Sequence, residues 1–290
     1  DSDRGAAMAA PTALVVVAGR ARSVGRLGWL GLHEDPSIAA VVRRGEGEAC
    51  ALWLGGGEPT LRSDLPALVT AVRQATGHGV GLDTDGHALT SARVVAGLRS
   101  VGLERVRIAL HSGRSDAHDW LVGVQGAARR ARRAIEVCAE AGIKVQLRCV
   151  VTRPTTDWLE ETVRLAARLG ATSIDLQRLV RPRIGLADEF IALSPRLGLA
   201  EPHLEAAIGA ARALGLSGRL LGFPRCAAPS LGPSFFADEP WLVPDDEALR
   251  GVAAALAPWP AAPGCAGCTK RRTCSGAPGD YVERFGRAEF

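Results

Sequence analysis

The stretch ALWLGGGEPTL, residues 51–61, decides the fold of this chain. Its opening apolar run, residues 51–54, predicts a strand that is covered on both faces, as the strands of a parallel sheet are. The three glycines that follow let the backbone approach a ligand closely, and ligands bind at the C-terminal ends of parallel strands. Glu58 places a carboxylate at the same end. We therefore expect a ligand-binding loop here, with a glycine-rich strand–helix turn as the plain alternative.

The same alternation of apolar run and amphipathic stretch recurs over the first two-thirds of the chain. Apolar runs predict strands at residues 14–17, 51–54, 80–82, 105–110, 144–152 and 172–179. Apolar residues at helical spacing predict helices at residues 61–74, 91–100, 126–141 and 157–169. Strand–helix units joined by right-handed crossovers form a parallel sheet. Six such units rather than eight predict an α/β fold with an open, partial (β/α)6 barrel of the TIM type.

The pattern changes after about residue 185. Helices are expected at residues 195–214 and 245–256, and prolines and glycines become frequent from residue 223 onward. Such a loop-rich segment is too small to form a large core, so it needs a structural metal site or another cross-link to be stable. We therefore divide the chain into an N-terminal tail (residues 1–11), a barrel (12–215) and a small C-terminal domain (216–290).

Composition restricts the partners and the compartment. The net charge is +4, but nearly all basic residues are arginines, and the densest group, residues 129–133, lies in a helical pattern typical of a solvated face. Aromatic residues make up only 4% of the chain, so bases would find few stacking surfaces, and we do not expect nucleic-acid binding. No apolar run reaches the roughly 18 residues of a membrane span, and we expect a cytoplasmic protein.

Four of the seven cysteines are found after residue 220: Cys226, Cys265, Cys268 and Cys274. In a cytoplasmic chain, clustered cysteines indicate a metal site rather than a disulfide framework. Four thiolates saturate one [4Fe–4S] cluster, and the same set suits tetrahedral zinc. The spacing of these four cysteines is compatible with both the [4Fe–4S] cluster and zinc. Isolated cysteines elsewhere are most often small buried hydrophobic residues.

The barrel region resembles the radical S-adenosylmethionine (SAM) superfamily. Residues 55–61 resemble its G-G-E-P-T-L segment, residues 84–86 take the place of its T-N-G, and residues 118–123 match H-D-x-x-x-G. The matches keep their order over residues 50–180. The resemblance implies that SAM is held through its methionyl group by residues at the strand ends, which are Gly56, Gly57, Glu58 and Thr84.

The C-terminal region resembles the SPASM and twitch domains of the same superfamily. The resemblance lies in the C-x2-C-x5-C pattern of Cys265, Cys268 and Cys274, followed by Gly276 and Tyr281. It favours one auxiliary [4Fe–4S] cluster over zinc, with Cys226 as the fourth ligand.

The resemblance fails at the opening loop of the barrel. The family's C-x3-C-x2-C cluster motif falls on Ala21, Gly25 and Gly28, whose side chains cannot bind iron. We therefore predict a degenerate member with no catalytic residue of its own and with poor residual SAM affinity. It would act as a partner or scaffold for a competent radical SAM subunit that modifies a peptide or a small metabolite. The alternative is an enzyme that uses SAM by non-radical chemistry in the same pocket.

Overall fold

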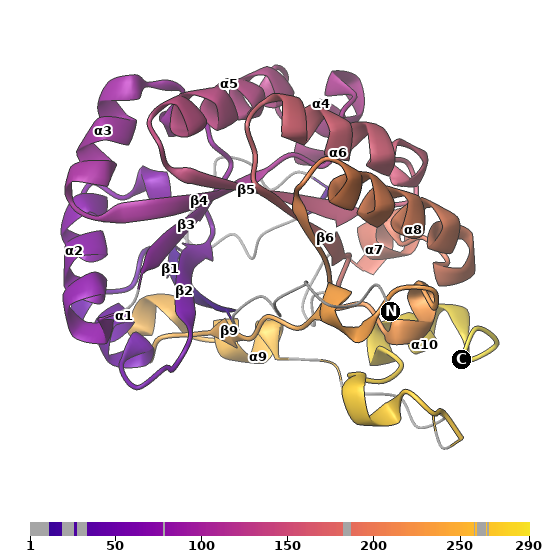
Figure 1. The fold of residues 1–290 in the computed structure, drawn as a ribbon. Coiled ribbons are helices and arrows are strands. Elements are labelled where there is room, and N and C mark those ends of the chain that lie inside the picture. The colour runs from indigo at the N-terminus through magenta and orange to yellow at the C-terminus, as the bar shows by residue number, and fades with distance from the viewer. Residues whose placement is uncertain are drawn as a thin grey trace.

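The computed structural model describes residues 12–18, 26–27, 34–77, 79–181, 187–257, 259, 265 and 267–290. Within these residues, nine strands form one parallel sheet in the order β8-β7-β6-β5-β4-β3-β2-β1-β9. The sheet is curled, and helices cover its convex side (Figure 1). The strands are β1 Thr12–Ala18, β2 Ala51–Gly56, β3 Val80–Thr84, β4 Leu103–Ala109, β5 Lys144–Val151, β6 Ser173–Arg178, β7 Ser217–Leu221, β8 Phe236–Ala237 and β9 Trp241–Leu242.

This architecture confirms the expected α/β half-barrel. All six expected strands are present as β1 to β6, and the sheet has three strands more than the expectation, β7 to β9. The added strands are short, and β8 and β9 have two residues each, so no periodic pattern marks them in the sequence.

The helices follow the expected spacing at six places and add four that the sequence did not show. They are α1 Ile38–Gly45, α2 Leu65–Thr76, α3 Ala92–Ser100, α4 Ser115–Val122, α5 Ala127–Glu140, α6 Leu159–Arg168, α7 Ala187–Leu193, α8 Leu197–Ala213, α9 Val252–Leu256 and α10 Gly279–Phe285. The missed ones, α1, α4, α7 and α10, have seven or eight residues each. Two turns are too few for a clear apolar period.

The two faces of the sheet differ in polarity. In β5, the residues that face the helices (Val145, Leu147, Cys149 and Val151) are fully or almost fully buried. The alternate residues of the same strand, Gln146, Arg148 and Val150, are only partly buried and line the concave side. At β5, apolar packing against the helices therefore holds the barrel wall, and the concave side carries polar groups; on β1 and β2 the concave side is apolar, with Leu14, Val16 and Trp53.

A short segment, residues 236–242, connects the two edges of the curled sheet. β8 pairs with β7 at one edge and β9 pairs with β1 at the other. The backbone N–H of Gly222 donates to Ala237 O at 2.9 Å, and that of Leu14 donates to Pro240 O at 3.0 Å. We call residues 236–242 the closing segment, because it spans the gap that the half-barrel leaves open.

The expected domain boundary near residue 215 falls directly before β7, which belongs to the same sheet as β1 to β6. The division into a barrel and a C-terminal domain stays a prediction. The end of the chain docks on the barrel through α10: Asp280 accepts a bond from Arg178 of β6 at 3.0 Å, and Tyr281 Oη accepts one from Leu197 N at 2.8 Å. Among the described residues, no helix is long and apolar enough to cross a membrane.

Candidate functional site

The glycine loop lies at the C-terminal end of β2, as expected. Gly56 adopts φ +101°, a region that favours glycine, and the N–H of Gly57 donates to Ala18 O at the end of β1 at 2.9 Å. Gly56 and Gly57 are partly exposed. The loop therefore presents accessible backbone at the rim where parallel sheets bind ligands.

The carboxylate of Glu58 connects this loop to the end of β3. Its Oε1 accepts from Thr84 Oγ1 at 2.7 Å and from Thr60 N at 3.0 Å, and its Oε2 accepts from Asp85 N at 2.7 Å. The structure thus brings Gly56, Gly57, Glu58 and Thr84 together. Because Glu58 is 3% exposed and bonded to the chain's own donors, it acts here by positioning the rim.

The environment of Glu58 also changes its acidity. Burial and the nearby Asp85 carboxylate together raise the pKa of this carboxyl to about 7, against the opposing effect of the bonds from Thr60, Asp85 and Thr84. The rim therefore holds a carboxyl group that titrates near neutral pH.

The loop that lacks the three cysteines is only partly described. Ala21, Gly25 and Gly28 lie outside the described residues. Arg26 is described: its N–H donates to Leu121 O at 2.8 Å, and its guanidinium lies 4.1 Å from the centre of the Trp120 ring. Leu27 packs against an apolar cluster beside α4 whose members are Leu121, Leu179, Phe190 and Leu193. Packing on α4 thus anchors this part of the loop.

The concave face of the sheet carries a buried ionic network. Arg107 of β4 is fully buried and pairs with Asp83 of β3 at 2.7 Å and with Glu239 of the closing segment at 2.7 Å. Arg219 of β7 pairs with Asp175 of β6 through two bonds of 2.8 Å. Burial alone would lower the pKa of Arg107, but the surrounding carboxylates raise it, so this guanidinium stays charged.

Arg148 of β5 extends the network, whereas Arg105 of β4 forms no ion pair with its carboxylates. Arg148 pairs with Asp83 at 2.7 Å, and Arg105 donates to the backbone oxygen of Gly79 at 2.9 Å. The sequence analysis did not identify this network. Its only signal is a charged residue at alternate positions of otherwise apolar strands, as in Arg105 and Arg107 of β4.

Two histidines near the rim are structural. The backbone N–H of His111 donates to His118 Nδ1 at 3.0 Å, and that of Val150 donates to His111 Nδ1 at 3.2 Å. Burial lowers the pKa of His118 to about 4 and places that of His111 well below its usual value. Both rings are neutral at pH 7 and serve as hydrogen-bond acceptors for the backbone.

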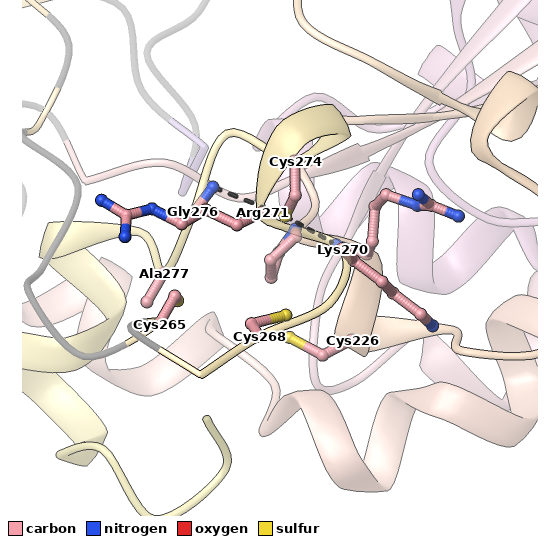
Figure 2. A pocket seen from close by; sticks show the side chains of 10 residues that line it. Cys226, Cys265, Cys268, Lys270, Arg271, Cys274, Gly276 and Ala277 are labelled. Carbon is pink, nitrogen blue, oxygen red and sulfur yellow. Dashed lines mark hydrogen bonds between the residues drawn. The ribbon is translucent and has the colours of Figure 1, made fainter.

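The four predicted metal-binding cysteines line one pocket. Cys226, Cys265, Cys268 and Cys274 line a small cavity of about 40 Å³, together with Lys270 and Arg271. Figure 2 shows the sulfur atoms of Cys226 and Cys268 pointing toward one another. Residues that are 48 positions apart in the sequence, Cys226 and Cys274, are thereby brought to one place.

Hydrogen bonds in this pocket suit a thiolate at Cys274, whereas burial favours the protonated thiol at Cys226. Two backbone N–H groups, of Arg225 and Gly276, donate to Cys274 Sγ at 3.3 and 3.5 Å (Figure 2). Burial and the charges of the other three thiols raise the pKa of Cys226 to about 11. Among the described residues, no group of three or more His, Cys, Asp or Glu side chains is arranged around a single metal ion.

Comparison with known proteins identifies the barrel. Residues 32–166 match the family model of the Radical SAM superfamily, so this part of the chain is a radical SAM domain. Over 159 residues the chain is 34% identical to the PqqA peptide cyclase of Ruegeria pomeroyi, and over 145 residues it is 39% identical to mycofactocin maturase MftC of Mycolicibacterium smegmatis. These segments cover 54% and 49% of this chain, but only 40% and 35% of the two relatives.

Solved structures show the same fold. SuiB of Streptococcus suis, solved with bound SAM, superposes with a TM-score of 0.62 at 17% identity, over 77% of this chain and 53% of SuiB. The superfamily implies a [4Fe–4S] cluster and SAM as its cofactors. SuiB, which shares the fold, has also been solved with its precursor peptide SuiA, and the PqqA cyclase is named for a peptide substrate.

Proposed function

We propose that this chain is a radical SAM-type barrel that generates no radical itself and serves as a partner or scaffold for a competent radical SAM subunit. It would hold one auxiliary [4Fe–4S] cluster through Cys226, Cys265, Cys268 and Cys274. The observation that carries the proposal is the replacement of the three loop cysteines by Ala21, Gly25 and Gly28 beside an otherwise complete barrel sequence.

The thiol pocket supports a metal site, and the resemblance to SPASM and twitch domains favours iron–sulfur over zinc there. A single zinc ion binds four sulfurs at about 2.3 Å and draws them close together. A [4Fe–4S] cluster joins each thiolate to a different iron and accepts a wider set. The four thiols line one pocket, and N–H groups donate to Cys274 Sγ, which suits bound thiolates. Such a cluster supplies structural support or one-electron transfer.

The concave face supports a ligand-binding role for the barrel. Its lining is polar on β4 to β7 and apolar on β1 and β2, and the rim formed by Gly56, Gly57, Glu58 and Thr84 is preorganised by hydrogen bonds. A peptide or small metabolite would bind on this face and be presented to the partner subunit. The peptide-processing names among the relatives favour a peptide.

Two measurements on anaerobically purified full-length protein test the proposal. We expect about four irons and four sulfides per chain, the content of one cubane cluster. With SAM and a strong reductant, we expect no 5′-deoxyadenosine above the level of a protein-free control.

Each result can contradict the proposal. About eight irons per chain would mean that a second cluster is bound in spite of the missing thiols. Catalytic formation of 5′-deoxyadenosine would reject the scaffold role. Transfer of another group from SAM would instead support non-radical chemistry at the same rim. Co-purification of a radical SAM protein with an intact C-x3-C-x2-C motif would identify the partner directly.

A further inference from the structure

Two backbone N–H groups converge on one sulfur of the thiol pocket. Arg225 N lies 3.3 Å from Cys274 Sγ, and Gly276 N lies 3.5 Å from the same atom. Gly276 is two positions from Cys274, but Arg225 is 49 positions away, so the fold brings the two donors together. Hydrogen bonds of this kind stabilise negative charge on the sulfur.

The chain's own contacts hold both donors in place. Gly276 adopts φ +90°, a region that favours glycine, and this turn directs its N–H back toward the sulfur. Arg225 is tied to the same segment, because its guanidinium donates to the Thr273 hydroxyl, next to Cys274. Cys274 Sγ therefore has hydrogen-bond donors that the protein itself positions.

The side chains that line the pocket are basic and not acidic. Arg225, Lys270 and Arg271 line it, and among the described residues no Asp or Glu does. The sequence shows the same bias: residues 222–237 and 265–278, which contain the four cysteines, have four Arg or Lys residues and no Asp or Glu. The pocket thus has a positive surrounding that no carboxylate in its lining neutralises.

Two of the four cysteines lie at the surface. Cys226 and Cys268 are exposed, whereas Cys265 and Cys274 are half-buried. A cluster bound by these residues would therefore be close enough to the surface to exchange electrons with another protein. Hydrogen bonds to sulfur, net charge and solvent exposure are also the properties through which a protein sets the reduction potential of a cluster.

The N–H donors and the basic side chains favour the reduced state of a cluster. Four thiolates outweigh the positive charge of a cubane core, so the cluster is an anion when oxidised and gains one more negative charge on reduction. Donated N–H groups and nearby positive charges stabilise the more negative state more strongly. The expected consequence is a higher reduction potential than the same four thiolates would give without these groups.

We propose that the two N–H donors on Cys274 and the positive charges of Lys270 and Arg271 raise the reduction potential of this cluster and make it a one-electron carrier, not a cross-link alone. A low-potential donor, such as a reduced flavin protein, gives the cluster one electron, and the cluster passes that electron to the partner subunit. No bond forms or breaks, and no proton moves. The inference rests on the proposed cluster and assigns its use.

Stepwise reduction of the anaerobically purified full chain with dithionite, followed by the EPR signal of the reduced cluster, gives the midpoint potential. At any fixed potential, Arg271→Gln should lower the ratio of reduced to oxidised cluster by about threefold or more. This is a fall of about 28 mV, because a tenfold change corresponds to about 59 mV for one electron. Lys270→Gln should act in the same direction. The matched control, Arg272→Gln, removes the same charge outside the pocket lining and should change the ratio by less than about twofold at about 0.15 M salt, which screens exposed charges.

Gly276→Ala tests the N–H donors. Alanine is strained at φ +90°, so the N–H of residue 276 should turn away from the sulfur. We expect this variant to keep its iron and to lower the same ratio by about threefold, because one hydrogen bond to sulfur is lost. An unchanged midpoint potential would contradict the role of this donor. Loss of the iron would reject it as well, because Gly276 would then be needed for binding itself.

The iron and sulfide content of every variant separates this inference from the proposed function. If the wild type carries one cluster but Arg271→Gln and Lys270→Gln leave its midpoint potential unchanged, or if the control shifts it equally, the inference is wrong and the proposed cluster stands. A cluster that dithionite does not reduce would be a cross-link alone and would also overturn the inference. Wild-type protein without iron would overturn both.

Discussion

Replacing Glu239 by glutamine tests the contact that closes the barrel. The Glu239 side chain is 8% exposed and binds the fully buried Arg107 through two bonds. It also accepts from Thr12 Oγ1 at 2.9 Å. Glutamine has the same size but carries no charge and has only one acceptor oxygen. The substitution leaves three arginines, Arg107, Arg148 and Arg219, facing two carboxylates, Asp83 and Asp175.

The expected cost follows from burial. Removing one partner of a buried ion pair costs about 3–5 kcal/mol when the other charge is left unpaired. Arg107 keeps Asp83, so we expect the lower end, about 3 kcal/mol. Since 1 kcal/mol shifts the melting temperature of a large domain by about 2–4 °C, Tm should fall by about 6–12 °C.

The control is Glu247→Gln, also in the C-terminal third of the chain. Glu247 pairs with Arg250, but both side chains are more than three-quarters exposed, and exposed pairs contribute at most about 1 kcal/mol. Urea unfolding at pH 7 and a thermal scan measure both variants. If Glu239→Gln loses less than about 1 kcal/mol, or no more than the control, the closing contact does not stabilise the barrel.

The pH dependence gives a second readout. Arg107 and the Thr12 hydroxyl hold the pKa of Glu239 below its ordinary value of 4.5, against the effect of burial. A lowered pKa in the folded state means that this stabilisation is fully present above pH 4.5 and is lost as the pH falls through the folded-state pKa. The difference between wild type and Glu239→Gln should therefore shrink below pH 4.5. A constant difference would contradict the charge-based account.

Three further outcomes are expected. Cys226→Ser should lose most of the bound iron, while Cys138→Ser, in a buried helix position outside the thiol pocket, should keep it; equal iron in both would reject the ligand assignment. Because the pKa of Glu58 is raised to about 7, its contribution to stability is fully present below pH 4.5 and lost as the pH rises through 7. Measured by urea titration, the free energy of unfolding of Glu58→Gln should depend less on pH between about 4.5 and 7 than that of the wild type. An equal pH dependence in the two proteins would contradict this account. Asp280→Asn should lower the free energy of unfolding by about 3 kcal/mol, because Arg178 loses a buried partner. Proteolysis of this variant should release the C-terminal segment first. Unchanged resistance to proteolysis would show that the Arg178–Asp280 ion pair is not needed to hold this segment.

Much of the fold could be predicted from local patterns. Apolar runs such as residues 14–17 predicted β1, because a strand buried on both faces requires consecutive apolar residues. The glycine loop at the end of β2 and the clustering of cysteines were predicted for the same local reason: glycine and thiol chemistry is visible residue by residue. The structure placed Gly56, Gly57, Glu58 and Thr84 at one rim and the four cysteines around one pocket.

The ionic network could not be predicted in the same way. Glu239 and Arg107 are 132 residues apart, and each is an ordinary charged residue in its own segment. Their contact depends on the closing segment reaching both edges of the sheet. Likewise, the pairing of Arg148 with Asp83 appears only when β5 and β3 are placed in the same sheet.

The amino-acid sequence thus determined which segments become strands and helices, and which residue types can bind metal or approach a ligand. The tertiary structure alone decided which charges meet on the concave face and how the half-barrel is closed. The physical reason is the separation along the chain over which each effect acts. Backbone propensity and apolar period act between near neighbours in the chain, whereas sheet register and burial bring together side chains whose positions no local pattern relates.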